Sequence, residues 1–259
     1  MISFASHGDV RRFEFSSVAS RLVGYSVNVF VVRGVMVDCG FPRARDAFAE
    51  VLGREKPRGL FITHHHEDHA GNAEVVARAG VPMATSDATL DRLRLPKSIK
   101  PYRRITWGSA PPLASEVARF EDDALSLIPA PGHCADHSVV WDAKEGTLFG
   151  GDLYLGVKVR IAHPGEDPRL LARTLREIAR LNPVRLFDAH RGFVPNPTPL
   201  LIAKAEWTEE MIGEIERRIA RGDSDVAIRR EVFGGESLPG YFSAGDYARI
   251  NFVRAVRKR

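Results

Sequence analysis

Three imidazoles and one carboxylate lie within six positions near residue 65, in the pattern H-x-H-x-D-H formed by His64, His66, Asp68 and His69. The apolar run at 59–62 before them predicts a buried strand that ends where the histidines begin. Residues two apart on an extended backbone point to the same side. We therefore expect His64 and His66 to converge on one ion and His65 to point away from it.

Asp68 and His69 stand at the turn into a predicted helix at 70–79. In that position they can face a second ion, so the motif predicts a dinuclear metal site. Imidazole and carboxylate donors suit zinc best, but they do not exclude manganese or iron, because no soft ligand selects against those metals.

Further candidate donors follow short apolar strands elsewhere in the chain. His133 lies in Pro131-Gly132-His133 after the run at 125–129, Asp152 in Gly150-Gly151-Asp152 after 147–149, and His190 in Ala189-His190-Arg191-Gly192 after 184–187. Each is a polar residue on a loop that a rigid strand would hold, which is how a scaffold places ligands. Each motif alone is typical of a turn, but the ordered set points to one site.

The ordered set THHHEDH, PGH, GGD and AHRG resembles the metallo-β-lactamase superfamily over residues 25–195. The resemblance implies an α/β fold, an αββα four-layer sandwich of two mixed β-sheets flanked by helices. It also implies two divalent metal ions. His64, His66 and His133 would bind one ion, Asp68, His69 and His190 the other, and Asp152 would bridge them.

The resemblance is closer to the glyoxalase II, lactonase and endoribonuclease branches than to the clinical β-lactamases, which depart from this ligand pattern. Asp38 in Val35-Met36-Val37-Asp38-Cys39-Gly40 matches an early family element in which the Asp supports the ligands. His137 is a second candidate for such support. Either residue has an ordinary alternative, since Asp38 can close a turn and His137 can be a partly buried core histidine.

These features predict a dinuclear metal-dependent hydrolase. A hydroxide bridging the two ions would attack the substrate, and Asp68 would orient it or pass a proton to the leaving group. Tyr154, Lys158 and Arg191 are candidate substrate-binding residues, with Tyr154 also a candidate catalytic group through its hydroxyl. Two of them have an ordinary alternative. Tyr154 can pack under its loop with its hydroxyl in water, and Lys158 can belong to a solvated face of a β-like stretch.

Composition sets the remaining limits. The 259 residues have a net charge of +4, from 37 basic and 33 acidic side chains, which is compatible with anionic substrates. No apolar run is long enough to span a bilayer and no signal-peptide core is visible, so we expect a cytoplasmic protein with no membrane contact. Cys39 and Cys134 do not suggest a disulfide framework, and we expect small buried thiols.

The Pro-rich stretch at 194–199 predicts a boundary between an αββα domain at 1–195 and a C-terminal helical region at 196–259. Helices are expected at 169–181, at 207–219, at 224–233, and from Ser243 to the terminus, where Ser243 and Asp246 resemble a capping box. The apolar faces of the tail could pack against a second copy in a homodimer.

Three functions compete for this site. The first is hydrolysis of an acyl bond in a small molecule, such as a thioester, a lactone or a related ester. The second is phosphodiester cleavage, as in an endoribonuclease, and only this alternative involves nucleic acid. The third, oxygen handling by a di-iron or mono-iron relative, is weakened because the flavodoxin partner of the di-iron branch is absent here and the mono-iron branch does not use all seven ligands. Acidic residues interleave with the basic ones in the first two helices of the tail, which favours an ordinary solvated face and hence the first function.

Overall fold

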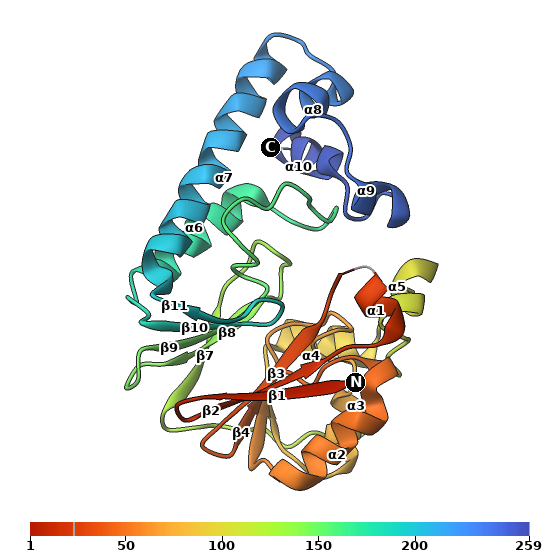
Figure 1. The fold of residues 1–259 in the computed structure, drawn as a ribbon, viewed down its shortest axis with the longest axis vertical. Helices are drawn as coiled ribbons and strands as arrows, with labels where there is room; N and C mark the ends of the chain where they lie inside the picture. The colour runs from red at the N-terminus through yellow and green to blue at the C-terminus, as the bar shows by residue number, and fades with distance from the viewer. Residues whose placement is uncertain (23, 259) are drawn as a thin grey trace. The chain divides into compact units, whose positions relative to one another are not determined.

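The computed structural model describes residues 1–22 and 24–258, and the chain forms two compact units (Figure 1). The first unit comprises 1–129, 136–152 and 184–195, and the second comprises 130–135, 153–183 and the chain from 196 onward. The expected boundary after residue 195 coincides with the last passage of the chain from one unit to the other. Because 130–135 and 153–183 also belong to the second unit, the chain passes between the two units more than once. The folding of 1–195 as one domain stays a prediction.

The first unit contains two mixed sheets. The six-stranded sheet runs in the order β1 (Ile2–His7), β2 (Val10–Phe15), β3 (Val27–Val32), β4 (Val35–Val37), β5 (Gly59–Phe61) and β6 (Met83–Ala84). The five-stranded sheet runs in the order β11 (Gly192–Pro195), β10 (Arg185–Asp188), β9 (Thr147–Gly151), β8 (Ser138–Asp142) and β7 (Leu125–Pro129). The pairs β4–β5, β5–β6 and β9–β10 are parallel, and the others are antiparallel.

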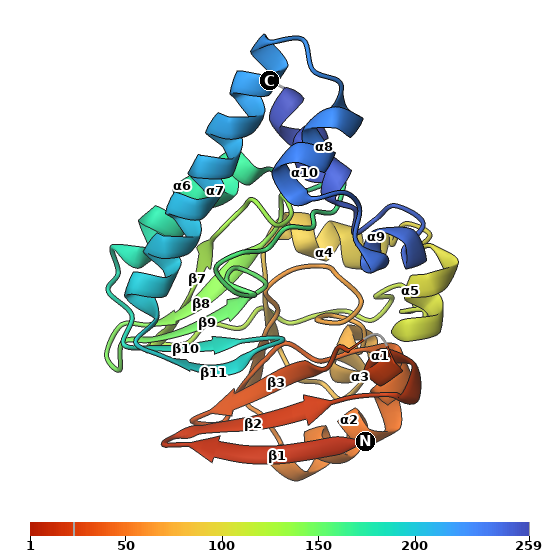
Figure 2. The ribbon, with the colours of Figure 1, turned by 45° about the horizontal axis from the view of Figure 1, so that its top comes forward.

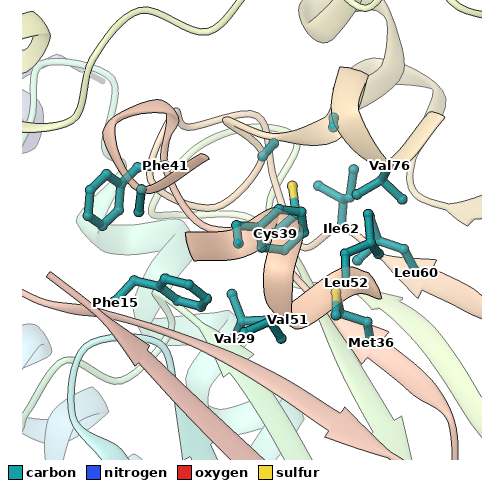
Figure 3. Close-up of a cluster of buried hydrophobic side chains, with 14 of the residues drawn as sticks. Phe15, Val29, Met36, Cys39, Phe41, Val51, Leu52, Leu60, Ile62 and Val76 are labelled. Carbon is teal, nitrogen blue, oxygen red and sulfur yellow. The ribbon is translucent and has the colours of Figure 1, made fainter. Parts of the chain in front are cut away.

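Strand β3 shows why these sheets need apolar residues on both faces. Val29 and Val31 face the core that includes helices α2 (Arg45–Glu55) and α3 (Ala73–Arg78), whereas Phe30 and Val32 pack with residues of the five-stranded sheet. Figure 3 shows the helix-side core, in which Val51 and Leu52 of α2 and Val76 of α3 lie with Val29, Met36, Leu60 and Ile62. This double burial explains the continuous apolar strands in the sequence.

Short helices complete the first unit. They are α1 (Val18–Leu22), the 3-10 turn η1 (Pro42–Ala44), α4 (Asp87–Arg94) and α5 (Pro101–Thr106). Figure 2 shows β1, β2 and β3 side by side in the six-stranded sheet.

The second unit is helical. Its helices are α6 (Pro168–Ala179), α7 (Pro197–Ala220), α8 (Asp225–Phe233), α9 (Leu238–Phe242) and α10 (Arg249–Arg257). Ile212, Ile215, Ile228, Phe252 and Val253 form part of its apolar core. The two mixed sheets, the flanking helices and the helical C-terminal region confirm the predicted αββα class of fold. Among the described residues, no helix is long and apolar enough to cross a membrane.

Several predicted element boundaries were wrong. The helix expected at 70–79 begins only at Ala73, because residues 67–72 form a run of tight turns. The Pro-rich stretch, where a boundary was predicted, joins β11, which ends at Pro195, directly to α7, which begins at Pro197. Proline is tolerated there because the first turn of a helix needs no backbone N–H donor.

The end of the chain also differs from the expectation. The last helix begins at Arg249 rather than Ser243, and its predicted end at Arg259 lies outside the described residues. Ala244 and Gly245 have positive φ angles of 48° and 88°, which break the helix between α9 and α10. The stretch around Lys158 is irregular rather than β-like, and Lys158 is exposed.

Glu74 provides a pH-dependent contribution to the stability of the first unit. Its buried carboxylate accepts hydrogen bonds from the backbone N–H groups of Ala114 and Ser115 (2.9 and 3.1 Å), the Ser115 hydroxyl (3.0 Å) and Arg78 Nε (2.8 Å). Burial alone raises the pKa of Glu74, but these donors outweigh it and lower that pKa to about 2. The carboxylate therefore stabilises the fold fully above its ordinary pKa of 4.5, and this contribution is lost as the pH falls toward 2.

We expect Glu74→Gln to lower the free energy of unfolding at pH 7 by roughly 2 kcal/mol, because hydrogen bonds to a buried charge are lost. The difference from the unmodified chain should shrink as the pH is lowered toward 3, which urea unfolding at several pH values would measure. Glu50→Gln, at an exposed position of α2, is the matched control. A deficit that stays constant with pH would contradict this account of Glu74.

Candidate metal centre

Loops that follow strands of both sheets bring imidazoles and carboxylates together in the first unit. The turns after β5 carry His64, His66, Asp68 and His69, the end of β9 leads directly into Asp152, and the turn between β10 and β11 carries His190. These residues form two groups of potential metal donors. One contains His64, His66 and Asp152, and the other contains Asp68, His69 and His190, with the donor atoms of each group within 4.8 Å of one another.

His64 and His66 face each other as the extended backbone predicted. His64 Nε2 lies 3.0 Å from His66 Nδ1. His64 Nδ1 lies 3.0 Å from Thr63 Oγ1, whose single proton is directed to Asp38. Because the Thr63 oxygen can then only accept from the ring, His64 carries its proton on Nδ1, and Nε2 has its lone pair available to an ion.

Asp152 lies between the two donor groups. Its Oδ1 atom is 3.2 Å from His69 Nε2 and 3.3 Å from His190 Nε2. Asp68 Oδ2 is 3.5 Å from His190 Nε2 and 3.9 Å from His69 Nε2. Two carboxylates and two imidazoles thus converge on one small volume.

The far nitrogens of two of these rings are held by acceptors. His69 Nδ1 lies 2.8 Å from Asp38 Oδ2, and His190 Nδ1 lies 2.8 Å from the Ser26 carbonyl oxygen. A carbonyl oxygen can only accept, so His190 is protonated at Nδ1 and presents Nε2 to Asp68 and Asp152. Fixing the outer nitrogen in this way orients the ring and sets its tautomer, as occurs around metal-binding histidines.

Asp38 holds the start of the histidine loop. Its carboxylate accepts from the Thr63 backbone N–H (2.8 Å) and hydroxyl (3.0 Å), besides His69. Its own backbone N–H donates to the Phe61 carbonyl, and its φ angle of +59° lies in the left-handed region. A strained backbone at a non-glycine residue persists only where its surroundings fix it, and here it aims the carboxylate at His69.

His137, directly before β8, supports Asp152, which follows the neighbouring strand β9 of the same sheet. The buried ring accepts a hydrogen bond from the Asp152 backbone N–H at Nε2 (3.1 Å). A Cβ atom on Gly151 would lie 2.8 Å from the same nitrogen, so this close approach requires glycine. Both residues proposed from the sequence as supports, Asp38 and His137, therefore contact candidate donors.

The electrostatics of the cluster show strongly coupled groups. Burial, followed by the nearby His69, His66 and His137, lowers the pKa of His64. Burial alone also lowers the pKa of His69 and of His190, but the carboxylates of Asp152 and Asp68 outweigh it and raise both pKa values well above the ordinary range. In turn, burial raises the pKa of Asp68, but His69 and His190 outweigh it and lower that pKa. The carboxylates thus attract positive charge to this point.

The residues present fit a divalent cation. Asp68 Oδ1 is buried and makes no hydrogen bond to any described residue, which is costly unless another group binds it. Cys39 is buried, as predicted, and burial raises the pKa of its thiol, which keeps it protonated. Cys134 is buried as well. The donors of the two groups in the first unit are thus nitrogen and oxygen atoms, the set that zinc, manganese or iron accepts.

Some predicted site residues belong to the second unit or to the surface. His133 lies in the 130–135 loop of the second unit, where its Nδ1 is 3.4 Å from Glu166. Tyr154 is largely buried in the same unit, where its carbonyl accepts from Lys204 Nζ at 2.5 Å. Arg191 is exposed in the first unit. The roles of His133, Tyr154, Lys158 and Arg191 stay predictions.

Sequence reasoning missed three contributors to the centre. Ser26 acts through a backbone carbonyl, which leaves no signal in a sequence. The role of Thr63 was not foreseen either, although its place next to His64 could have suggested it. The third, Glu67, interrupts the donor pattern and is held by Arg103. His65 points to Asp136, with Nδ1 at 2.9 Å from its carboxylate.

Comparison with known proteins agrees with this geometry. A model of the metallo-beta-lactamase superfamily matches residues 22–190. The chain belongs to this superfamily. Its two His/Asp donor groups are the kind of metal site that the superfamily carries, so we describe the protein as a metal-dependent hydrolase of the metallo-beta-lactamase superfamily.

Two curated relatives extend the comparison within the superfamily. The "Beta-lactamase-like protein 2 homolog" of Caenorhabditis elegans is 26% identical over 244 residues, which cover 84% of this chain and 73% of the relative. A hydroxyacylglutathione hydrolase of a Methylobacterium species is 30% identical over 172 residues, which cover 59% of each chain. The chain thus spans about three fifths of the length of this second relative.

Solved structures show the same fold. A metallo-beta-lactamase family protein from Thermus thermophilus matches with a TM-score of 0.68 at 16% identity, covering 98% of this chain and 95% of the other. A metallo-beta-lactamase from Pontibacter korlensis matches with a TM-score of 0.62 at 18% identity, covering 81% of this chain and 99% of the other. At these identities the structures establish the superfamily fold alone.

Gly71 tests how tightly the turns after the histidines are packed. A Cβ atom there would lie 2.2 Å from the Glu67 carbonyl oxygen and 2.4 Å from Pro42 Cδ. We expect Gly71→Ala to lower the free energy of unfolding by on the order of 2–3 kcal/mol, because the overlap forces the backbone apart. Gly53→Ala is the control, since nothing lies within 4 Å of that added atom in α2.

The control should instead stabilise the protein by about 0.5–1 kcal/mol, the usual gain from alanine inside a helix. Chemical denaturation of both variants measures the difference. A Gly71→Ala variant as stable as the parent chain would show that the turns are looser than the structure indicates.

Proposed function

We propose that this chain hydrolyses an acyl bond of a small molecule, such as a thioester, a lactone or a related ester, with two divalent metal ions, most simply zinc. The observation that carries the proposal is the convergence of two nitrogen and oxygen donor groups on Asp152, whose Oδ1 lies within 3.3 Å of two imidazoles. A purely structural metal site needs only one closed set of four ligands. Two adjacent groups that share a carboxylate are better suited to catalysis.

Seven residues would hold the ions. His64, His66 and His133 would bind one, Asp68, His69 and His190 the other, and Asp152 both. When bound, such ions lower the pKa of water toward neutrality and polarise the bond to be cleaved.

The chain's own groups would do the remaining work. Asp38 and the Ser26 carbonyl hold His69 and His190 in orientation, so that the centre is formed before substrate arrives. Asp68 Oδ1, buried and without a hydrogen bond to a described residue, can accept a proton and return it to the leaving group. Tyr154 would bind the substrate oxygen through its hydroxyl, with Lys158 and Arg191 at the rest of the substrate.

The choice of an acyl substrate is supported by the relatives. One curated relative, 30% identical, is named a hydroxyacylglutathione hydrolase, a name that describes hydrolysis of an acylated glutathione. Acidic residues interleave with the basic ones in α7, and their ion pairs with Arg176, Arg217 and Arg218 leave less positive charge for a phosphate backbone.

The metal content can be tested without a substrate. We expect the purified chain to bind two equivalents of zinc, measured by mass spectrometry of metals after dialysis. His190→Ala should reduce the content, because it removes one imidazole from the group with Asp68 and His69. His163→Ala removes a histidine outside the clustered donors and should leave the content unchanged. Equal metal content in His190→Ala and the parent chain would contradict the assignment of His190.

The substrate class requires a rate comparison. The metal-loaded chain should hydrolyse members of a thioester and lactone panel, and His69→Ala should lower the rate by at least about a hundredfold, since it removes both a ligand and the partner of Asp38. Single-stranded RNA is assayed beside the panel. RNA cleavage that depends on His69, with no acyl hydrolysis, would replace the present proposal with the phosphodiesterase alternative.

A further inference from the structure

Glu67 is a buried acidic residue within the metal-binding motif that does not point to the donors. It stands between His66 and Asp68, one residue from each donor group. Arg103 of α5 binds it through two parallel hydrogen bonds, Nε to Oε1 at 2.5 Å and Nη2 to Oε2 at 2.8 Å. Both side chains are only 7% exposed.

A buried, bidentate pair of this kind is a strong geometric constraint. The planar guanidinium matches the carboxylate with two parallel bonds, so it fixes the direction as well as the distance of its partner. Burial of two charges is costly, and two apolar side chains of similar size would often stabilise the fold as well or better. Stability alone therefore does not explain why charged residues occupy these positions, and a need for fixed geometry does.

The motif is held from two sides. On one side, the backbone N–H of Cys39 donates to the His69 carbonyl (2.7 Å) and that of Gly71 donates to the Gly40 carbonyl (2.9 Å). On the other side, the Arg103 guanidinium donates two hydrogen bonds to the Glu67 carboxylate. Asp68 and His69 lie between these two sets of hydrogen bonds, and their side chains have to stay directed toward the donor cluster around Asp152.

Helix α5 is itself fastened to the protein, so Arg103 can transmit a fixed position. Trp107, directly after α5, packs its ring on Phe41 with centroids 5.0 Å apart, and its carbonyl accepts from the Arg43 backbone N–H at 2.9 Å. The helix is too short to be stable alone, so these contacts determine where Arg103 stands.

We propose that Arg103 is a positioning residue of the metal centre, which acts through Glu67 to hold the segment from His66 to His69 in the conformation that binds metal. This inference rests on the proposed function, because it presumes the metal centre. It assigns to α5, outside the ligand motifs, a direct influence on metal affinity.

The test compares metal affinity with stability in the full-length chain. Arg103→Lys keeps the charge but loses the two parallel bonds, and Glu67→Gln keeps the shape but loses the charge. Each should weaken zinc binding by about 10–100-fold in competition with a chelator, as removal of an outer-shell partner does. With Co²⁺ in place of zinc, the visible absorption spectrum should change, because the angles between the ligands change.

Arg33→Met is the matched control, because Arg33 also pairs with a buried carboxylate, Asp142 at 2.6 Å, away from the donors. It should lower the thermal stability of the metal-free chain while leaving zinc affinity and the cobalt spectrum unchanged. Glu67→Gln combined with Arg103→Lys should weaken zinc binding no more than the stronger single change, because the two side chains act as one unit.

The outcomes separate this inference from the proposed function. If the unmodified chain binds zinc and the Arg103 and Glu67 variants bind it equally well, with only stability reduced, the positioning role is overturned and the metal centre stands. If the unmodified chain binds no zinc, the metal centre fails, and the role of Arg103 fails with it. Should one of the two single variants, Arg103→Lys or Glu67→Gln, not fold, the other still decides the question.

Discussion

The hydrogen bonds of the Asp38 carboxylate are the interaction on which the candidate centre depends most. Asp38 follows β4, Thr63 and His69 follow the neighbouring strand β5, and one carboxylate binds both of them. The two strands are parallel, so their carboxyl ends meet at the same edge of the sheet, and Asp38 converts that adjacency into fixed positions. Without this acceptor, Thr63 would not set the proton of His64, and the His69 ring would be free to turn.

The sheets supply rigidity to a centre that no single element could build. The donors come from three separate stretches of the chain, and each stretch leaves a strand that is buried on both faces. Since side chains in such cores occupy single rotamers, the ends of the strands are fixed to within small displacements. Single direct hydrogen bonds are then enough to hold the donor residues in place. Asp38, His137 and the Ser26 carbonyl each make such a bond.

Much of the site could be predicted because its signals are local. The two-residue period of an extended chain placed His64 and His66 on one side and His65 on the other. The donor loops leave strands β5, β9 and β10, of which β9 and β10 are labelled in Figure 1. The αββα class followed from the resemblance of four ordered motifs. Boundaries were less predictable, because the turns at 67–72 depend on Gly71 fitting against Glu67 and Pro42, contacts that exist only after folding.

Other features could not be predicted, since they depend on distant parts of the chain. The backbone carbonyl of Ser26 reaches His190 across 164 positions, and the guanidinium of Arg103 reaches Glu67 across 36. The Ser243 and Asp246 pair looked like a helix cap, but the Ser243 hydroxyl accepts from Tyr247 in a turn, and Gly245 breaks the helix. Helix capping signals describe a local preference, and the tertiary arrangement decides whether a helix follows.

The distribution of the donors over both sheets has a mechanical consequence. His69 follows a strand of the six-stranded sheet, whereas Asp152 and His190 follow strands of the five-stranded sheet. An ion held by all three would tie the two sheets together at that edge, so that slow opening of the sandwich and release of the ion would become one event. Loading with metal would then protect the backbone amides at the ends of β5, β9 and β10 from hydrogen exchange in proportion to the free metal concentration. Under the proposed function, the ion would thus be a reversible cross-link of the sandwich as well as a reagent.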